Sequence, residues 1–186
     1  MTSRKRKSKK PSVTKASPAK LLENEIFFVD RSSGKYGLVQ GLQNLELNVE
    51  RHDDHFTQTT IDVEWISYCG EKQWIIVSSD KNIKKNILEK QAIMVTGVAA
   101  FFFTSASISS HQQVEAFSKA LKRISNFVQS QKRPFIATIS QDGTVTLWVN
   151  HKGEDCIQQK LLRRKQNKIR KQSNETFGVN SFTDDE

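Results

Sequence analysis

The chain has 186 residues and a formal charge of +9, which is enough length for one domain with a sizeable core and too little for two full ones. No apolar run approaches the ~18 residues of a membrane span, and the basic N-terminus lacks the apolar stretch of a signal peptide, so we expect a soluble, cytoplasmic protein. The two cysteines, Cys69 and Cys156, form no CxxC pair and are too few for a disulfide framework.

The positive charge is concentrated at the two ends of the chain. The first 20 residues carry eight Lys/Arg and no acid, residues 160–186 carry a net +3, and the remaining residues 21–159 carry −2. We therefore expect a disordered basic tail over residues 1–20, one domain over residues 21–155, and a basic, helical segment with a disordered C-terminus over residues 156–186. Such tails contact nucleic-acid backbones, serve as nuclear-import patches or stay solvated, and the sequence leaves these alternatives open.

Short apolar runs alternate with helical patterns through the first hundred residues. Strands are predicted over residues 25–30, 45–52, 74–79 and 98–103, and helices over residues 34–45, 61–73 and 86–98. In the second helix the pattern points Ile61, Trp65, Ile66 and Cys69 inward. Strands that alternate with helices favour parallel pairing, so we predict a three-layer α/β/α sandwich with a mainly parallel central sheet.

The rest of the chain predicts one long helix, a hairpin and a basic end. Ser110 and Gln113 form a capping-box pattern ahead of an amphipathic helix. Residues 133–150 read as two strands around the turn Asp142-Gly143, a C-terminal β-hairpin that extends or covers the sheet. Residues 158–172 form a helical pattern with a thin apolar stripe, and residues 173–186 are expected to be disordered.

Acidic residues follow two of the predicted buried strands. Asp30 ends the first run and Asp80 follows the run WIIVSS, while Asp62 and Glu64 stand near the start of the helix between them. The carboxyl ends of parallel strands share one edge of a sheet, where ligands bind. If the first and third strands are neighbours, these acids face one pocket.

Such a cluster needs a neutralising partner. Two carboxylates ~5 Å apart repel by about 3 kcal/mol at an effective dielectric of about 20, so their convergence does not serve stability. Mg²⁺ or Mn²⁺ prefers oxygen ligands and shares its shell with substrate phosphate. Asp30, Asp62 and Asp80 are the predicted metal ligands, with Glu64 as a further candidate catalytic acid.

Basic and acidic residues beside these positions complete the predicted site. Arg31 and Lys81 directly follow the strand-end acids, and with Lys84 and Lys85 they are candidates to hold a substrate phosphate. Asp53 and Asp54 come after the second strand. Each is a candidate for an additional acid of the site or for a residue that hydrogen-bonds to the metal ligands and supports them. A lone aspartate after a strand is more often a turn or helix-cap residue. It is the combination of acids that favours a site.

The segments FFVDRSSGK, HDDHF, DVEW, WIIVSSDKNIKKN and RPFIATISQDGTV together resemble the PIN-like domain of VapC-type toxins, over about residues 25–148. The resemblance implies an RNA-cleaving enzyme that uses Mg²⁺ or Mn²⁺ and pairs with an antitoxin protein. By position it assigns Asp30, Asp62 and Asp80 to the acid cluster. Many PIN nucleases carry a fourth acid after the next strand, where this chain has only Thr104 and Ser105, so one-metal and two-metal chemistry both stay open.

Other functions fit the sequence less well. Gly34, Gly37 and Gly41 do not have dinucleotide-binding spacing, and nucleophile-elbow and P-loop patterns are absent from the sequence. The main alternative is a catalytically inactive RNA-binding or partner-binding module on the same fold, and a homodimer also stays open. The presence of all three acids favours the enzyme.

Overall fold

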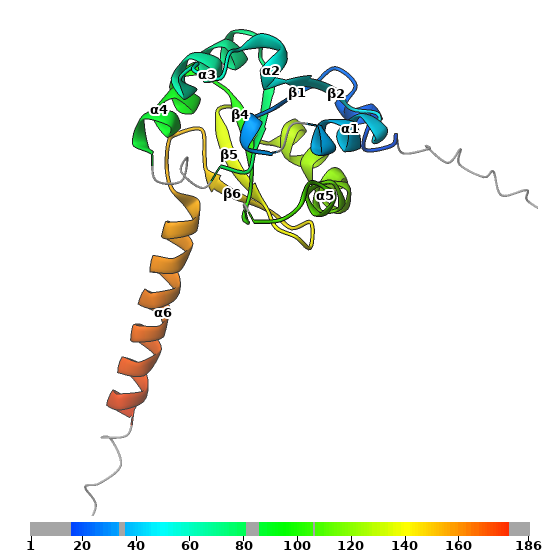
Figure 1. The fold of residues 1–186 in the computed structure, drawn as a ribbon. Coiled ribbons are helices and arrows are strands. Elements are labelled where there is room, and N and C mark those ends of the chain that lie inside the picture. Colours follow the sequence, from blue (N-terminus) through cyan, green and yellow to red (C-terminus); the bar gives the residue numbers. More distant parts are fainter. Residues whose placement is uncertain (1–15, 34–35, 81–85, 106, 179–186) are drawn as a thin grey trace, which may run out of the picture.

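The computed structural model describes residues 16–33, 36–80, 86–105 and 107–178. Its centre is one six-stranded sheet wrapped by helices (Figure 1). The strands are β1 (Ile26–Val29), β2 (Asn48–Arg51), β3 (Ile75–Ser78), β4 (Ala99–Phe103), β5 (Phe135–Ile139) and β6 (Val145–Val149). The helices are α1 (Gly37–Asn44), α2 (His52–His55), α3 (Asp62–Glu71), α4 (Ile87–Thr96), α5 (Ser110–Ser130) and α6 (Cys156–Gly178), with 3-10 turns η1 (Lys20–Leu22) and η2 (Arg31–Ser33).

The strand order across the sheet is β2-β1-β3-β4-β5-β6. Every neighbouring pair is parallel except β5 with β6, which forms the predicted hairpin. The hairpin therefore extends the sheet. β1 lies between β2 and β3, so the connections from β1 to β2 and from β2 to β3 run in opposite directions across the sheet. Such a reversal opens a crevice at the carboxyl edge of the strands.

Two hydrophobic cores, one on each face, make the sheet the middle of three layers. One core packs α1 and α5 against alternate strand residues such as Phe27 and Phe101. The other packs α3 and α4 against the intervening residues, including Phe28 and Phe102. Central strands buried on both faces explain why their sequence is continuously apolar. The predicted fold class is confirmed.

Two details of the helices differ from the sequence predictions. The capping box of α5 is formed by Ser109 and Gln112, one residue earlier than expected. Gln113 is instead buried and donates to the Ser79 hydroxyl at 3.0 Å. Ile61 is 67% exposed, because it precedes α3 as its N-cap residue in an extended conformation and so does not share the buried face of the helix.

The last helix differs from all the others in its surroundings. After its first turn, α6 leaves the body of the molecule and projects away from it (Figure 1). It runs to Gly178 and so includes residues 173–178, for which the sequence predicts disorder. Within the described ranges no helix has the length and apolar character required to cross a membrane.

Candidate metal centre

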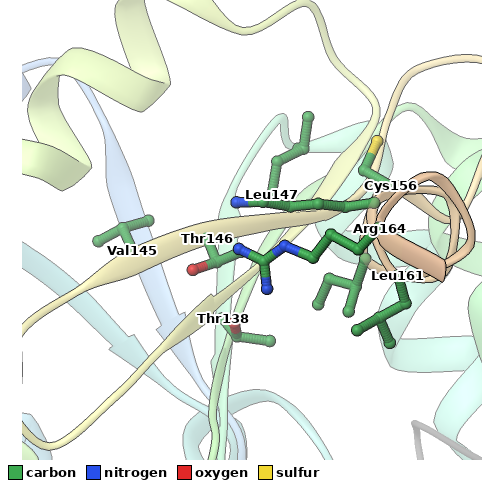
Figure 2. Close-up of a pocket in the computed structure, with 9 residues that line it drawn as sticks. Thr138, Val145, Thr146, Leu147, Cys156, Leu161 and Arg164 are labelled. Atoms are coloured by element: carbon green, nitrogen blue, oxygen red, sulfur yellow. The ribbon is translucent and has the colours of Figure 1, made fainter. Parts of the chain in front are cut away.

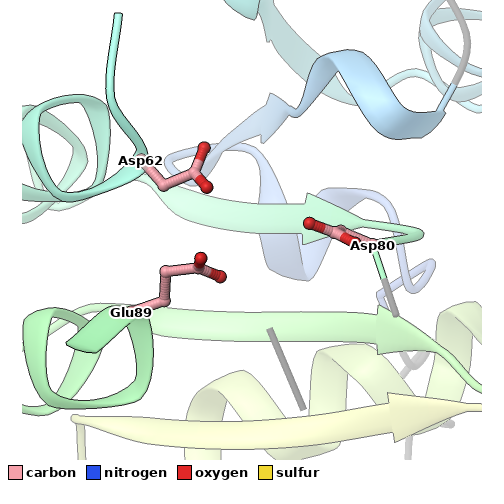
Figure 3. A group of neighbouring side chains, drawn as sticks. All are labelled: Asp62, Asp80 and Glu89. Atoms are coloured by element: carbon pink, nitrogen blue, oxygen red, sulfur yellow. The ribbon is translucent and has the colours of Figure 1, made fainter. Parts of the chain in front are cut away.

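Three carboxylates from different elements converge on one side of the sheet. Asp62 is the first residue of α3, Asp80 follows β3 by two residues, and Glu89 lies in the first turn of α4. One oxygen atom from each lies within 4.8 Å of the others. Figure 3 shows the three carboxyl groups facing a common space between the two helices and the end of the strand.

Asp62 is fixed by its own helix. Trp65, one turn further along α3, donates its indole N–H to Asp62 Oδ1 at 2.9 Å. Trp65 is buried and stacks on Phe28 of β1 with ring centroids 5.5 Å apart. The carboxylate is therefore anchored to the core through a rigid aromatic side chain.

Glu89 is the most confined member of the group. It is 3% exposed, and its Oε1 accepts a hydrogen bond from the Asn86 side chain while Oε2 is buried without a hydrogen-bond partner. Burial, together with the negative charge of Asp62, raises the pKa of Glu89 to about 7. An unpartnered buried oxygen beside two more carboxylates is an arrangement that a cation would stabilise.

The donor set fits a hard divalent cation. Oxygen atoms on opposite sides of Mg²⁺ are about 4.2 Å apart, twice the usual Mg–O distance of about 2.1 Å. The observed limit of 4.8 Å lies close to this value. Asp62, Asp80 and Glu89 could therefore bind one ion with small side-chain movements. Carboxylate oxygen favours Mg²⁺ or Mn²⁺ over metals that prefer sulfur or nitrogen ligands.

Asp30 is not a member of this group of three, although it lies at the same edge. It is 8% exposed, and its Oδ2 accepts hydrogen bonds from the Ser32 hydroxyl at 2.5 Å and the Ser78 hydroxyl at 2.8 Å. The Asp80 amide donates to that same Ser78 hydroxyl at 3.0 Å. Asp30 is thus connected to Asp80 through one shared side chain. Its predicted role as a metal ligand stays a prediction.

The other predicted acids lie outside the group. Glu64 is exposed in the first turn of α3. Asp53 forms an ion pair with Arg31 at 2.9 Å and Asp54 one with Arg51, and these arginines hold the pKa of each carboxyl below its usual range, although burial acts in the opposite direction. Both aspartates therefore already have cationic partners.

The contacts of Arg31 argue against its predicted role in holding phosphate. Besides the pair with Asp53, its guanidinium bonds to the Gln58 and Thr57 carbonyl oxygens at 3.2 and 3.1 Å and to His52 Nδ1 at 3.2 Å. These bonds tie η2 to α2 and to the loop after it. Lys81, Lys84 and Lys85, the remaining candidates for phosphate contact, lie outside the described residues.

Sequence reasoning missed Glu89, although a signal was present. The predicted acids either follow strands or stand at the start of the helix before β3. The same rule applied to α4 would have selected Glu89, three residues after its N-cap Asn86. A capping role explains an acid at this position by itself, so the sequence alone did not favour a ligand.

Comparison with known proteins agrees with this geometry. Residues 26–105 match the protein family described as "PIN like domain". This segment of the chain is therefore similar to a PIN-like domain. The matched range holds Asp30 and all three clustered acids, whereas α5, the hairpin and α6 lie beyond it. The resemblance noted from the sequence is thereby confirmed.

A curated protein of Mycobacterium tuberculosis (strain ATCC 25618 / H37Rv) is also similar to this chain. Its name is "Putative ribonuclease VapC45", and it is 28% identical over 123 residues, which make up 64% of this chain and 88% of that protein. No solved structure matches the chain significantly.

Proposed function

We propose that this chain is a metal-dependent endoribonuclease of the PIN type and the toxin of a toxin–antitoxin pair. The observation that carries the proposal is the convergence of Asp62, Asp80 and Glu89 within 4.8 Å at the carboxyl edge of the sheet. The match to a PIN-like domain and the similarity to a protein named as a VapC ribonuclease support it.

The chemistry assigns separate tasks to the residues. A bound Mg²⁺ or Mn²⁺ would supply Lewis acidity toward a phosphodiester and lower the pKa of water. Asp62, Asp80 and Glu89 would hold it, and Trp65 would keep Asp62 in place. Ser78 orients Asp30 and the backbone of Asp80 together, so Asp30 would act as a fourth acid at the edge of the site. Burial and the negative charge of Asp62 raise the pKa of Glu89, so a bound cation would favour the ionised form of this carboxyl.

The finer assignments belong to the same proposal. The substrate is RNA, the partner is a cognate antitoxin protein, and the protein acts in the cytoplasm as a nuclease domain over residues 21–155 with basic extensions on both sides. Cleavage rates with Mg²⁺ and with Mn²⁺ identify the metal, and light scattering of the pure chain measures whether it forms a homodimer. The second candidate function is a catalytically inactive RNA-binding or partner-binding module on the same fold.

Cleavage of labelled RNA by the purified chain tests the proposal. Mg²⁺ or Mn²⁺ should support cleavage and EDTA should stop it. Asp80→Asn should lower the rate by more than about a hundredfold, beyond the 10–100-fold typical of groups that only support metal ligands. Asp54→Asn, an exposed change outside the cluster, is the matched control. RNA binding without cleavage under every metal condition would favour the inactive module.

A further inference from the structure

The helix α6 is exposed almost from its start. Its first turn is anchored by Ile157, which packs against the core beneath α3 and α4, and by a β-bridge between Val149 and Asp155. Every residue from Gln158 to Arg170 is exposed, including Leu161. A single helix that packs little of its surface is marginally stable in water. Most of the described length of this helix is therefore exposed to solvent.

The charge on α6 indicates what kind of partner it needs. Six cationic side chains lie between Lys160 and Arg170, and the sequence has no acid between residues 156 and 172. Lys160, Arg164 and Lys168 follow one another at intervals of four residues, so they stand on one side of the helix and repel each other. A polyanion laid along the helix would remove this repulsion.

A groove runs between the start of α6 and the last two strands. It has a volume of about 530 Å³, and its lining includes Thr138, Thr146, Leu147, Lys160, Leu161 and Arg164, with no acidic residue among the lining residues. Figure 2 shows the Arg164 side chain reaching from α6 over the strands toward Thr146 and Thr138. Cations and hydroxyl donors over an apolar floor suit a sugar–phosphate backbone.

The register of the sheet places this groove in line with Ser78, two residues before the cluster acid Asp80. Ser78 pairs with Phe102, Phe102 with Thr138, and Thr138 with Thr146, so these four residues form one row across the sheet. Phe102 belongs to the core under α3 and α4, which fixes the face on which the row lies. Ser78 and Thr138 are two strand spacings apart, which is about 10 Å.

A second connection joins the two places through α4. Lys90, next to Glu89, lies over the ring of Trp148 at 4.5 Å from its centroid. Trp148 in turn donates its indole N–H to Asp155 Oδ2 at 3.1 Å, immediately before α6. The helix α4, which supplies Glu89, thus contacts Trp148 of β6, and Trp148 bonds to the residue just before α6.

We propose that α6 and the groove at its base form a backbone-binding track for single-stranded RNA, in which Lys160 and Arg164 bind phosphates and deliver the same strand to the acid cluster. The inference rests on the proposed function only in taking this RNA as the substrate. An acidic protein partner is the competing occupant. The spread of charge along the helix and the hydroxyl-lined groove favour RNA.

Binding is measured with a labelled single-stranded oligouridylate and the full chain carrying Asp80→Asn, so that the RNA stays intact. The double change Lys160→Gln/Arg164→Gln removes two phosphate contacts. It should reduce the magnitude of the slope of log affinity against log salt by about 1.4. If the variant and the parent bind equally at 1 M salt, the variant should then bind about 25-fold more weakly at 0.1 M salt. Lys122→Gln/Lys132→Gln, on and beyond α5, removes the same charge elsewhere and should match the parent more closely.

The outcomes separate this inference from the proposed function. Weaker binding with a reduced slope, and unchanged thermal unfolding, supports the track even if the parent chain cleaves no RNA. In a chain that cleaves, the double variant should raise KM with little change in kcat. Binding and slope equal to those of the control variant would overturn the track, as would loss of an antitoxin complex without any loss of RNA affinity.

Discussion

Ser78 donates a hydrogen bond to Asp30 at 2.8 Å, and both side chains are buried where β1 and β3 end. The same hydroxyl accepts the Asp80 amide. One small side chain thereby sets the position of two acids that are 50 residues apart in sequence number. The position of Asp80 relative to Asp30 is therefore linked to this one residue.

Replacing this hydroxyl should affect stability and activity together. Ser78→Ala deprives a buried carboxylate of one of its donors and should lower the free energy of unfolding by about 1–3 kcal/mol. RNA cleavage should fall by about 10–100-fold, as for other groups that orient metal ligands. Ser67→Ala, whose hydroxyl bonds to Val63 O within its own helix, is the control. Full activity in Ser78→Ala would show that Asp30 and Asp80 do not need this link.

The acid cluster should also make the protein respond to metal without substrate. Saturation at a hundred times the Kd for Mn²⁺ should stabilise the wild-type chain by about 2.7 kcal/mol, because the folded state alone offers a preformed site. Asp62→Asn and Asp80→Asn should lose most of this gain, whereas Asp54→Asn should keep it. Thermal unfolding with and without Mn²⁺ measures the effect. An equal gain in Asp62→Asn would place the ion elsewhere.

Glu89 should give the metal-free protein a pH-dependent stability. Its pKa is raised from about 4.5 to about 7 in the folded state, so between these values the folded chain binds more protons than the unfolded chain. Stability should therefore fall as pH rises through this window, by on the order of 1–3 kcal/mol at about 1.4 kcal/mol per pKa unit.

Urea unfolding in EDTA at about pH 5 and pH 8 measures this fall. Glu89→Gln cannot ionise, so its stability should decline less over the same range. Glu64→Gln, an exposed change in the first turn of α3, should behave as the wild type. Identical pH profiles for wild type and Glu89→Gln would contradict the raised pKa.

Arg31 should act on stability and not on RNA affinity. Arg31→Gln breaks the pair with Asp53 and the bonds to the loop after α2, and should cost about 1–3 kcal/mol, the range for hydrogen bonds to charged groups and groups left unpaired. The salt dependence of RNA binding should not change. A slope reduced by about 0.7, the value of one phosphate contact, would restore the role expected from the sequence.

The positions of the strands along the chain could be predicted from the sequence. Phe27, Phe28 and Val29 sit in a run that is apolar throughout, and only a strand covered on both faces requires this. Ile61 was misplaced because a residue just before a helix shares the apolar pattern but not the backbone conformation. The capping box shifted by one residue for a similar reason, since Ser109 and Ser110 are both acceptable caps.

From the sequence, the acids of the site could be placed at one edge of the sheet. The distances between their carboxyl groups could not be predicted. Asp62 and Asp80 converge as expected, whereas Asp30 is turned toward two serines whose contribution has no sequence pattern. Glu89 enters because α3 and α4 lie side by side, and that packing depends on contacts far apart in the chain. Arg31 follows an acid in sequence, yet its side chain bonds to Asp53 in α2.

The two outermost strands of the sheet restrict how the molecule can associate. β2 is four residues long and carries Glu50 and Arg51, whose side chains pair with His55 and Asp54 at that border. β6 is followed at once by the bridge between Val149 and Asp155. Short, charged or covered borders discourage strand addition by another chain. Addition of a strand from another chain is therefore disfavoured along β2 and at the Val149 end of β6.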